Sequence, residues 1–213
     1  MPVILKEKFL DDCLFGIWEI RESIDDLLPL VHFYPGERDR WTGFKSTERK
    51  IEFLSVRILL KELIGVCGPI VYSDRKKPYI HQSEYRISIS HSQTLTAIML
   101  SKTKKIGLDL EYMSHKIEKI QHRFINADEY ITSNPLKKKY HLYIHWCAKE
   151  ALYKICDKQD ISFQKNLTIE PFEPFNMGVI YGWVDNKFWH DKFELSYFTI
   201  NNYVVVYCCK KLA

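Results

Sequence analysis

Residues 86–111 carry the pattern that decides the fold: RISISHSQTLTAIMLSKTKKIGLDLE. Apolar and polar residues alternate over 86–90, and a short turn leads into the apolar run 95–100. A second turn, 101–104, leads into 106–111. A period of two is typical of strands, and turns this short join antiparallel neighbours. The stretch therefore predicts an antiparallel meander of three strands.

Two long amphipathic helices are predicted, over 46–64 and roughly 138–157. Apolar residues at the helical period are Val56, Leu59, Leu60 and Leu63 in the first, and Ile144, Cys147, Ala148, Ala151, Leu152 and Ile155 in the second. Gly65 is a plausible end of the first helix, and a further helical region is expected over 115–132, broken at Asn134-Pro135. Strands are expected over 15–20, 161–170, 179–184, 192–200 and 203–209, with turns at Asp185-Asn186 and Asn201-Asn202.

The strand and helix of the first part recur in the second. A glycine-containing strand at 15–20 and the helix at 46–64 are followed, about 90 residues later, by a glycine-containing strand at 106–111 and the helix at 138–157. The pattern predicts an α+β fold of two similar halves, residues 1–103 and 104–213. Each half would pack a long helix on an antiparallel sheet.

Composition narrows the function classes. The 213 residues are 46% hydrophobic with a net charge of +4, which excludes disorder and is too balanced to indicate a nucleic-acid binder. Six cysteines at positions 13, 67, 147, 156, 208 and 209 form no CxxC pair, so neither a structural zinc site nor a disulfide framework is expected. Without an export signal or an apolar run near the ~18 residues of a membrane span, a cytoplasmic location is expected.

Two pairs of charged residues could carry chemistry. Asp109 and Glu111 are two apart on a predicted strand, so their carboxylates share a face and could hold one Mg²⁺; the alternative is acids that simply face water. Gly107 beside them would admit a ligand or another backbone. Glu150 and Lys154 are four apart on a helix and form either an exposed ion pair or a metal ligand with a phosphate-stabilising cation.

Ser88, Ser90 and His91 end a strand and could bind phosphate oxygens. A serine–histidine nucleophile pair is disfavoured, because Ser90 and His91 diverge along a strand and no Gly-x-Ser-x-Gly elbow is present.

These segments, in this order, resemble the motifs of the 4′-phosphopantetheinyl transferases. Ile87-Ser88-Ile89-Ser90-His91-Ser92 is similar to (N/S)-x-S-H-S, and Gly107-Leu108-Asp109-Leu110-Glu111 is similar to G-(I/V)-D-x-E. Trp146-Cys147-Ala148-Lys149-Glu150-Ala151-Leu152-Tyr153-Lys154 is similar to W-x-x-K-E-(A/S)-x-x-K. Lys77-Pro78 resembles a Gly-Lys-Pro element with Lys76 in place of glycine, and Arg123-Phe124 to Glu129 an Arg-Phe…Glu segment. Length and duplication resemble the large, single-chain (surfactin-synthetase-activating) type, and this resemblance implies that the two α+β halves are related by a pseudo-twofold.

The resemblance implies the reaction. It would transfer 4′-phosphopantetheine from coenzyme A to a serine of an apo acyl, polyketide or peptidyl carrier protein and release 3′,5′-ADP. Mg²⁺, with Mn²⁺ as the alternative, would be held by Asp109, Glu111 and Glu150 of the C-terminal half. Glu150, directly or through a metal-bound water, would accept the serine proton, and Lys154 would stabilise the leaving phosphate.

The resemblance also assigns the coenzyme contacts. Ser90 and His91 would contact its phosphates, Lys77 the adenine edge or a phosphate, and Arg57, placed only by its position on the first long helix, the 3′-phosphate. Coenzyme A would lie between the halves of a monomer that binds neither nucleic acid nor membrane. Gln93 replaces a frequent glycine after Ser-His-Ser.

Other residues near the motifs are expected to be structural. Lys149 is expected to be structural or an outer-shell partner, Trp146 to pack between the halves, and His141 and His145 to lie on the surface. Two alternatives stay open: a Mg²⁺-dependent nucleotide diphosphohydrolase using the same acids, and a nucleic-acid-binding module.

Overall fold

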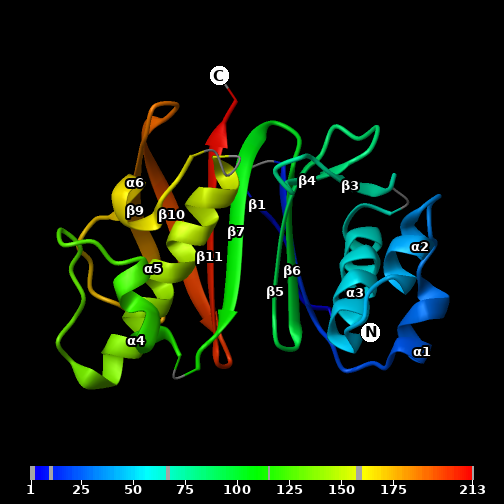
Figure 1. Ribbon diagram of the computed structural model, residues 1–213, viewed down its shortest axis with the longest axis horizontal. Coiled ribbons are helices and arrows are strands. Elements are labelled where there is room, and N and C mark those ends of the chain that lie inside the picture. Colours follow the sequence, from blue (N-terminus) through cyan, green and yellow to red (C-terminus); the bar gives the residue numbers. More distant parts are fainter. Residues whose placement is uncertain (1–2, 10–11, 66–67, 115, 157–159, 213) are drawn as a thin grey trace. The chain divides into compact units, whose positions relative to one another are not determined.

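The computed structural model describes residues 3–9, 12–65, 68–114, 116–156 and 160–212. The chain divides into two compact units, Met1–Thr103 and Lys104–Ala213. Each unit combines helices with antiparallel sheet, so the predicted α+β class is confirmed (Figure 1).

The first unit is built on an antiparallel sheet with strand order β1-β2-β6-β5. Its strands are β1 (Val3–Phe9), β2 (Cys13–Glu19), β5 (Arg86–Ser92) and β6 (Leu95–Ser101), with a separate hairpin of β3 (Ile70–Tyr72) and β4 (Pro78–Ile80). Its helices are α1 (Ile24–Leu27), η1 (Leu28–Leu30), α2 (Glu37–Thr42) and α3 (Thr47–Ile64). Helix α3 packs on β2 and β6, and its apolar face forms the core with Trp18 and Ile98.

Helix α3 begins and ends where the sequence indicates. The Ser46 hydroxyl accepts a hydrogen bond from the Arg49 amide at 3.2 Å, which caps the first turn. Gly65 follows the last turn with φ of 74°, a backbone conformation that glycine adopts without steric cost.

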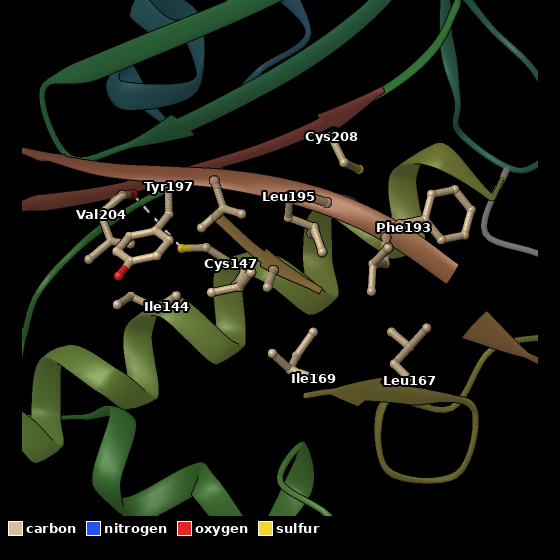
Figure 2. Close-up of a cluster of buried hydrophobic side chains, with 14 of the residues drawn as sticks. Ile144, Cys147, Leu167, Ile169, Phe193, Leu195, Tyr197, Val204 and Cys208 are labelled. Atoms are coloured by element: carbon tan, nitrogen blue, oxygen red, sulfur yellow. Dashed lines mark hydrogen bonds between the residues drawn. The ribbon is translucent and has the colours of Figure 1, made fainter. Parts of the chain in front are cut away.

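The second unit has an antiparallel sheet with strand order β7-β11-β10-β9-β8. The strands are β7 (Lys104–Tyr112), β8 (Leu167–Ile169), β9 (Met177–Asp185), β10 (His190–Ile200) and β11 (Tyr203–Lys211). The helices are α4 (Ile117–Ile120), η2 (Gln121–Arg123), α5 (Pro135–Ile155) and α6 (Phe163–Asn166). The apolar face of α5, including Ile144 and Cys147, packs on residues of β8, β10 and β11 such as Ile169, Leu195 and Val204 (Figure 2).

The predicted three-stranded meander is wrong in its third strand. Strands β5 and β6 pair antiparallel as predicted, with Ser92 opposite Leu95 across a two-residue turn. The other edge of β6 pairs with β2, and β7 pairs instead with β11, Glu111 lying opposite Val204. The sequence pattern marked the strands correctly, but it carries no information on which edge each strand joins.

Two other segments differ from the prediction because side chains bond the local backbone. The region 115–132 is helical only through α4 and η2; beyond them the Glu129 carboxylate accepts the Asn126 amide at 2.9 Å and closes a loop. Asn134 caps α5 rather than ending a helix. In the predicted strand 161–170, the Ser162 amide donates to the Asn166 side chain at 2.7 Å, and α6 forms before β8.

Strands β2, β9, β10 and β11 confirm the remaining strand predictions, whereas β1, β3 and β4 were not predicted. In the parts of the chain that the structure describes, no helix combines the length and apolar character needed to cross a membrane. The cysteines at 13, 147, 156, 208 and 209 are free thiols. Cys67 and residues 115 and 157, where two predicted helices begin and end, lie outside the described residues.

A glycine sits under the long helix in each unit. A Cβ on Gly16 would meet the side chains of Leu59 and Leu63 on α3 at 3.0 Å. A Cβ on Gly107 would lie 2.1 Å from the backbone carbonyl oxygen of Ala151 on α5. Gly107 therefore makes room for the backbone of α5. The sequence left open whether this glycine admits a ligand or another backbone, and the structure shows a backbone there.

Gly107→Ala is expected to destabilise the second unit by about 3 kcal/mol, because the helix backbone must move away from β7. Urea unfolding followed by circular dichroism measures the loss. Gly182→Ala is the control in the same sheet, since its Cβ would meet only side-chain methyl groups, at 3.0 Å and beyond. Equal costs for the two variants would contradict a special close approach at Gly107.

Candidate active site

Asp109 and Glu111 lie on the face of β7 that α5 covers. Side chains two and four residues beyond Gly107 share its face, and Gly107 contacts α5. Val206 and Val204, their cross-strand partners on β11, belong to the core beneath the same helix. Asp109 is buried at 4% exposure and Glu111 is half-buried, so these acids do not simply face water.

Lys154, in the last turn of α5, binds Asp109. Its ammonium donates to Asp109 Oδ1 at 2.7 Å and to the Leu108 carbonyl at 2.8 Å. The lysine side chain is 19% exposed and the aspartate side chain 6%. The pair joins the strand motif to the helix motif, and its low exposure limits screening by solvent.

Cys147 and Glu150 lie on the same side of α5 as Lys154. Residues three and four apart stack on one helix face, and Glu150 lies three after Cys147 and four before Lys154. The Cys147 thiol donates to the Val204 carbonyl at 3.9 Å (Figure 2). Burial, followed by the carboxylates of Asp109 and Glu111, raises the pKa of this thiol. Glu150 is half-buried and lies between Cys147 and Lys154 on this side of the helix.

The donor chemistry of this region fits a hard divalent cation. Asp109, Glu111 and Glu150 supply carboxylate oxygens, and the Lys154 ammonium shows that a cation can sit against Asp109 Oδ1 and a backbone carbonyl. Among the described residues, however, no three histidine, cysteine, aspartate or glutamate side chains are gathered closely enough to hold a metal ion. The acids are therefore suitable donors that are not assembled around one point.

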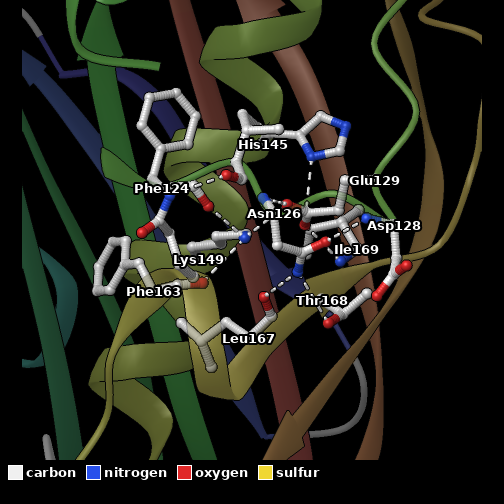
Figure 3. A network of polar contacts seen from close by, with 12 residues as sticks. Phe124, Asn126, Asp128, Glu129, His145, Lys149, Phe163, Leu167, Thr168 and Ile169 are labelled. Atoms are coloured by element: carbon white, nitrogen blue, oxygen red, sulfur yellow. Dashed lines mark hydrogen bonds and ion pairs between the residues drawn. The ribbon is translucent and has the colours of Figure 1, made fainter. Parts of the chain in front are cut away.

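A buried polar network holds the middle of α5. The Lys149 ammonium donates to the Phe124 carbonyl, to Glu129 Oε2 at 2.7 Å and to the Phe163 carbonyl at 3.0 Å (Figure 3). Both side chains of the Lys149–Glu129 pair are fully buried. Lys149 thus ties the helix to two loops, and a structural role, one of the two expected, accounts for all three of its bonds.

Glu129 is the acceptor at the centre of that network. Its Oε1 accepts the Ile169 amide at 2.8 Å and its Oε2 the Asn126 amide at 2.9 Å (Figure 3). Burial raises the pKa of Glu129, but the nearby His145 ring and the Lys149 ammonium outweigh it, and the pKa lies below its ordinary value. Glu129 therefore stays ionised as the counter-ion of Lys149.

His141 and His145 correct the expectation of a surface position, because both are fully buried. Their rings pack 4.9 Å apart and against Phe172. His141 Nδ1 accepts the Thr132 amide at 3.2 Å, so the ring is neutral, and His145 Nδ1 lies 3.6 Å from Glu129 Oε1. Burial lowers the pKa of His145 and, with His145 adding to it, lowers that of His141 to about 4.

Trp146 packs within the second unit, its ring 5.2 Å from that of Phe124 and 5.6 Å from that of Phe163. Phe124 and Phe163 are also the residues whose carbonyls bond Lys149, so this aromatic cluster lies beside the buried polar network. From the sequence, Cys147 was expected only in the core. It lies three residues before Glu150 and seven before Lys154, and this spacing indicates that the three residues share one side of the helix.

The first-unit candidates lie on β5 and α3. Ser90 is buried on β5, and His91 Nδ1 lies 3.1 Å from Glu52 Oε1 of α3. Arg49 Nη1 lies 3.4 Å from His91 Nε2, which brings a guanidinium cation to the imidazole. The strand end thus presents a histidine held between an acid and an arginine of the long helix.

Arg57 is committed to the core of the first unit. Nε and Nη2 donate to Glu37 Oε1 at 3.0 and 2.7 Å, and Nη1 donates to the Phe53 carbonyl. Its side chain is 9% exposed, and burial lowers its pKa against the effect of Glu37. Buried and bonded through three nitrogens, Arg57 is poorly placed to take a phosphate, and we do not carry it into the proposed coenzyme site.

Lys76 and Gln93, which replace glycines of the family motifs, both have a left-handed backbone conformation. Lys76 has φ of 59° and Gln93 φ of 50°, the region that glycine favours. Lys76 lies in the turn of the β3–β4 hairpin, where its amide donates to the Ser73 carbonyl, and the half-buried Lys77 follows it. Gln93 is the first residue of the β5–β6 turn. The chain keeps the turn geometry that glycine would give.

The second unit matches a known protein family over nearly its whole length. Residues 105–208 match the family described as the 4′-phosphopantetheinyl transferase superfamily. The second unit therefore belongs to this superfamily, and the matched residues include α5 and all of β7 after its first residue.

A curated relative supports the same assignment. The chain is 28% identical over 175 residues to the 4′-phosphopantetheinyl transferase HetI of Nostoc sp. strain PCC 7120, covering 76% of this chain and 70% of the relative. The chain is thus an enzyme, a 4′-phosphopantetheinyl transferase, of the family that modifies carrier proteins.

The buried histidines are expected to make stability fall as pH drops from about 6.5 to about 4, where the unfolded chain binds protons that the folded chain does not. Above pH 6.5 these groups contribute no slope. His141→Asn keeps an acceptor for the Thr132 amide without titrating, so it should flatten the fall by about 1–3 kcal/mol. Urea midpoints measured from pH 4 to 8 check this, with the exposed His190→Asn as control; an unchanged slope in His141→Asn would be contradictory.

Lys149→Met is expected to destabilise the protein by about 3 kcal/mol, because it leaves the Glu129 carboxylate buried without its counter-ion. Glu129→Gln combined with Lys149→Met should cost less than the sum of the single changes. Urea unfolding of all four members of the cycle measures the coupling, and the exposed Lys165→Met is the matched control. Additive costs would show that the pair is not coupled.

Proposed function

We propose that this enzyme transfers 4′-phosphopantetheine from coenzyme A to a serine hydroxyl of an apo carrier protein, in a Mg²⁺-dependent reaction that releases 3′,5′-ADP. The observation that carries the proposal is the contact of Lys154 with Asp109. It brings together residues that lie 45 positions apart and belong to two separate motifs. An ordinary exposed ion pair within one helix, the alternative for Glu150 and Lys154, does not require this convergence.

The reaction is a substitution at phosphorus. The serine oxygen forms a bond to the phosphorus that carries pantetheine, and the bond from that phosphorus to the oxygen of the departing 3′,5′-ADP breaks. The proton of the hydroxyl must leave, and negative charge develops on the departing oxygen. The protein therefore has to supply a base, positive charge and positioning.

Residues of the second unit are suited to these tasks. Glu150, half-buried on the Lys154 side of α5, accepts the serine proton, since a carboxylate is an acceptor when ionised. Lys154, one turn further along the helix, places its ammonium against the departing phosphate. Mg²⁺ or Mn²⁺, bound by Asp109, Glu111 and Glu150, would neutralise charge on the diphosphate. Gly107 supports all of them by keeping the helix close to β7.

Residues of the first unit supply the coenzyme contacts. We assign Ser90 and His91 to its phosphates and Lys77 to the adenine edge or a phosphate. His91 already lies beside Arg49, and Lys77 follows two basic residues in its turn. Two α+β units in one chain support membership of the large, single-chain type.

Asp109→Asn is expected to reduce modification of an apo carrier at least 100-fold, because it removes the charge that both Lys154 and a metal ion would use. Mass spectrometry of candidate apo carriers incubated with coenzyme A, Mg²⁺ and enzyme detects the added phosphopantetheine. The exposed turn residue Asp185 gives the control Asp185→Asn.

Wild-type protein that cleaves coenzyme A without modifying any carrier would overturn the proposal in favour of a diphosphohydrolase. Modification by Asp109→Asn at the wild-type rate would overturn the role of Asp109 alone. The relative rates on acyl, polyketide and peptidyl carriers identify the preferred partner.

A further inference from the structure

Lys154 places its ammonium directly against the carboxylate of Asp109. Its ammonium is fixed by two hydrogen bonds, to Asp109 Oδ1 at 2.7 Å and to the Leu108 carbonyl at 2.8 Å. The second bond matters because it ties the lysine ammonium to the backbone of β7, so the side chain does not extend into the solvent. The lysine is therefore held at the carboxylate by the strand itself.

The pair lies where charges act strongly on each other. The two side chains are 19% and 6% exposed, so solvent screens them less than it screens a surface pair. Glu111, on the same face of β7 as Asp109, and Glu150, on the same side of α5 as Lys154, add two further carboxylates. The lysine offsets one of these three negative charges, and a divalent cation at Asp109 would have to share the carboxylate with the ammonium.

We propose that Lys154 is a built-in counter-ion that weakens divalent-metal binding by the protein alone. The diphosphate of coenzyme A, arriving with the metal, draws the ammonium away from Asp109 onto a phosphate oxygen. Metal binding and coenzyme binding are thereby coupled. This inference rests on the proposed function for the coenzyme step, but its first consequence, weak metal binding in the absence of coenzyme, is independent of it.

The coupling follows from electrostatics. An ammonium hydrogen-bonded to Asp109 repels a divalent cation placed at the same carboxylate, and a diphosphate attracts both. Removing the lysine charge removes the repulsion and leaves Asp109 without its partner, so the metal becomes the favoured counter-ion. By linkage, a ligand that relocates the lysine must raise metal affinity, and metal must raise affinity for that ligand by the same factor.

Lys154→Met tests the first consequence directly. Mn²⁺ binding to the purified protein without coenzyme, measured by the loss of the free-ion electron paramagnetic resonance signal, is expected to tighten at least tenfold relative to wild type. Lys137→Met removes the same charge from an exposed position on the same helix and should bind as wild type does. Binding by Lys154→Met that is no tighter than wild type would overturn the proposal.

Two further variants place the effect at Asp109. Lys154→Arg keeps the charge and should retain weak binding, whereas Asp109→Asn combined with Lys154→Met should lose the gain. If Lys154→Met is unfolded in metal-free buffer, circular dichroism after addition of MnCl₂ replaces the binding measurement. Recovery of the folded signal would support the proposal, and its absence would overturn it.

The coenzyme step has a separate readout. Mn²⁺ titrations of wild-type protein with and without coenzyme A, corrected for Mn²⁺ bound by coenzyme alone, should show affinity rising with coenzyme to at least that of Lys154→Met. In Lys154→Met the coenzyme should add less. An equal gain in both proteins would overturn the relocation of Lys154, while failure of wild type to bind coenzyme A at all would instead overturn the proposed function.

Discussion

The site depends on the close approach of the α5 backbone to β7 at Gly107. A side chain there would meet the Ala151 carbonyl at 2.1 Å, so the helix could not lie where it does. Because α5 lies this close, a lysine one turn beyond Ala151 reaches an aspartate two residues beyond Gly107. The absence of one methyl group thus sets the distance between the two chemically active segments.

The buried network around Lys149 holds the middle of α5, on the N-terminal side of Ala151. One ammonium bonds two loop carbonyls and Glu129, which in turn accepts amides from a loop and from β8 (Figure 3). Buried ion pairs contribute little net stability against apolar replacements but specify geometry when every partner is satisfied. The network therefore fixes how α5 sits, and Glu150 is the next residue along the helix.

The helices and strands could be predicted from the sequence more completely than the pairing of the strands or the contacts of the side chains. Helix α3 and strands β5, β6, β7, β10 and β11 follow from periodicity and turn residues, which are local properties. The pairing of β7 with β11 did not, because alternation is the same whichever neighbour a strand joins. The buried positions of His141 and His145 were missed for a similar reason: only packing against Phe172 and Glu129 shows that these rings are enclosed.

The sequence by itself determined the class of enzyme, since Gly107-Leu108-Asp109-Leu110-Glu111 and the helical motif from Trp146 to Lys154 are local patterns of residue type. Tertiary structure decided what each charged group touches. Arg57 and Lys154 are both cations on long helices, yet one is enclosed by Glu37 and Phe53 and the other meets Asp109. A side chain's partner depends on contacts between segments far apart in the chain, and residue spacing carries no record of them.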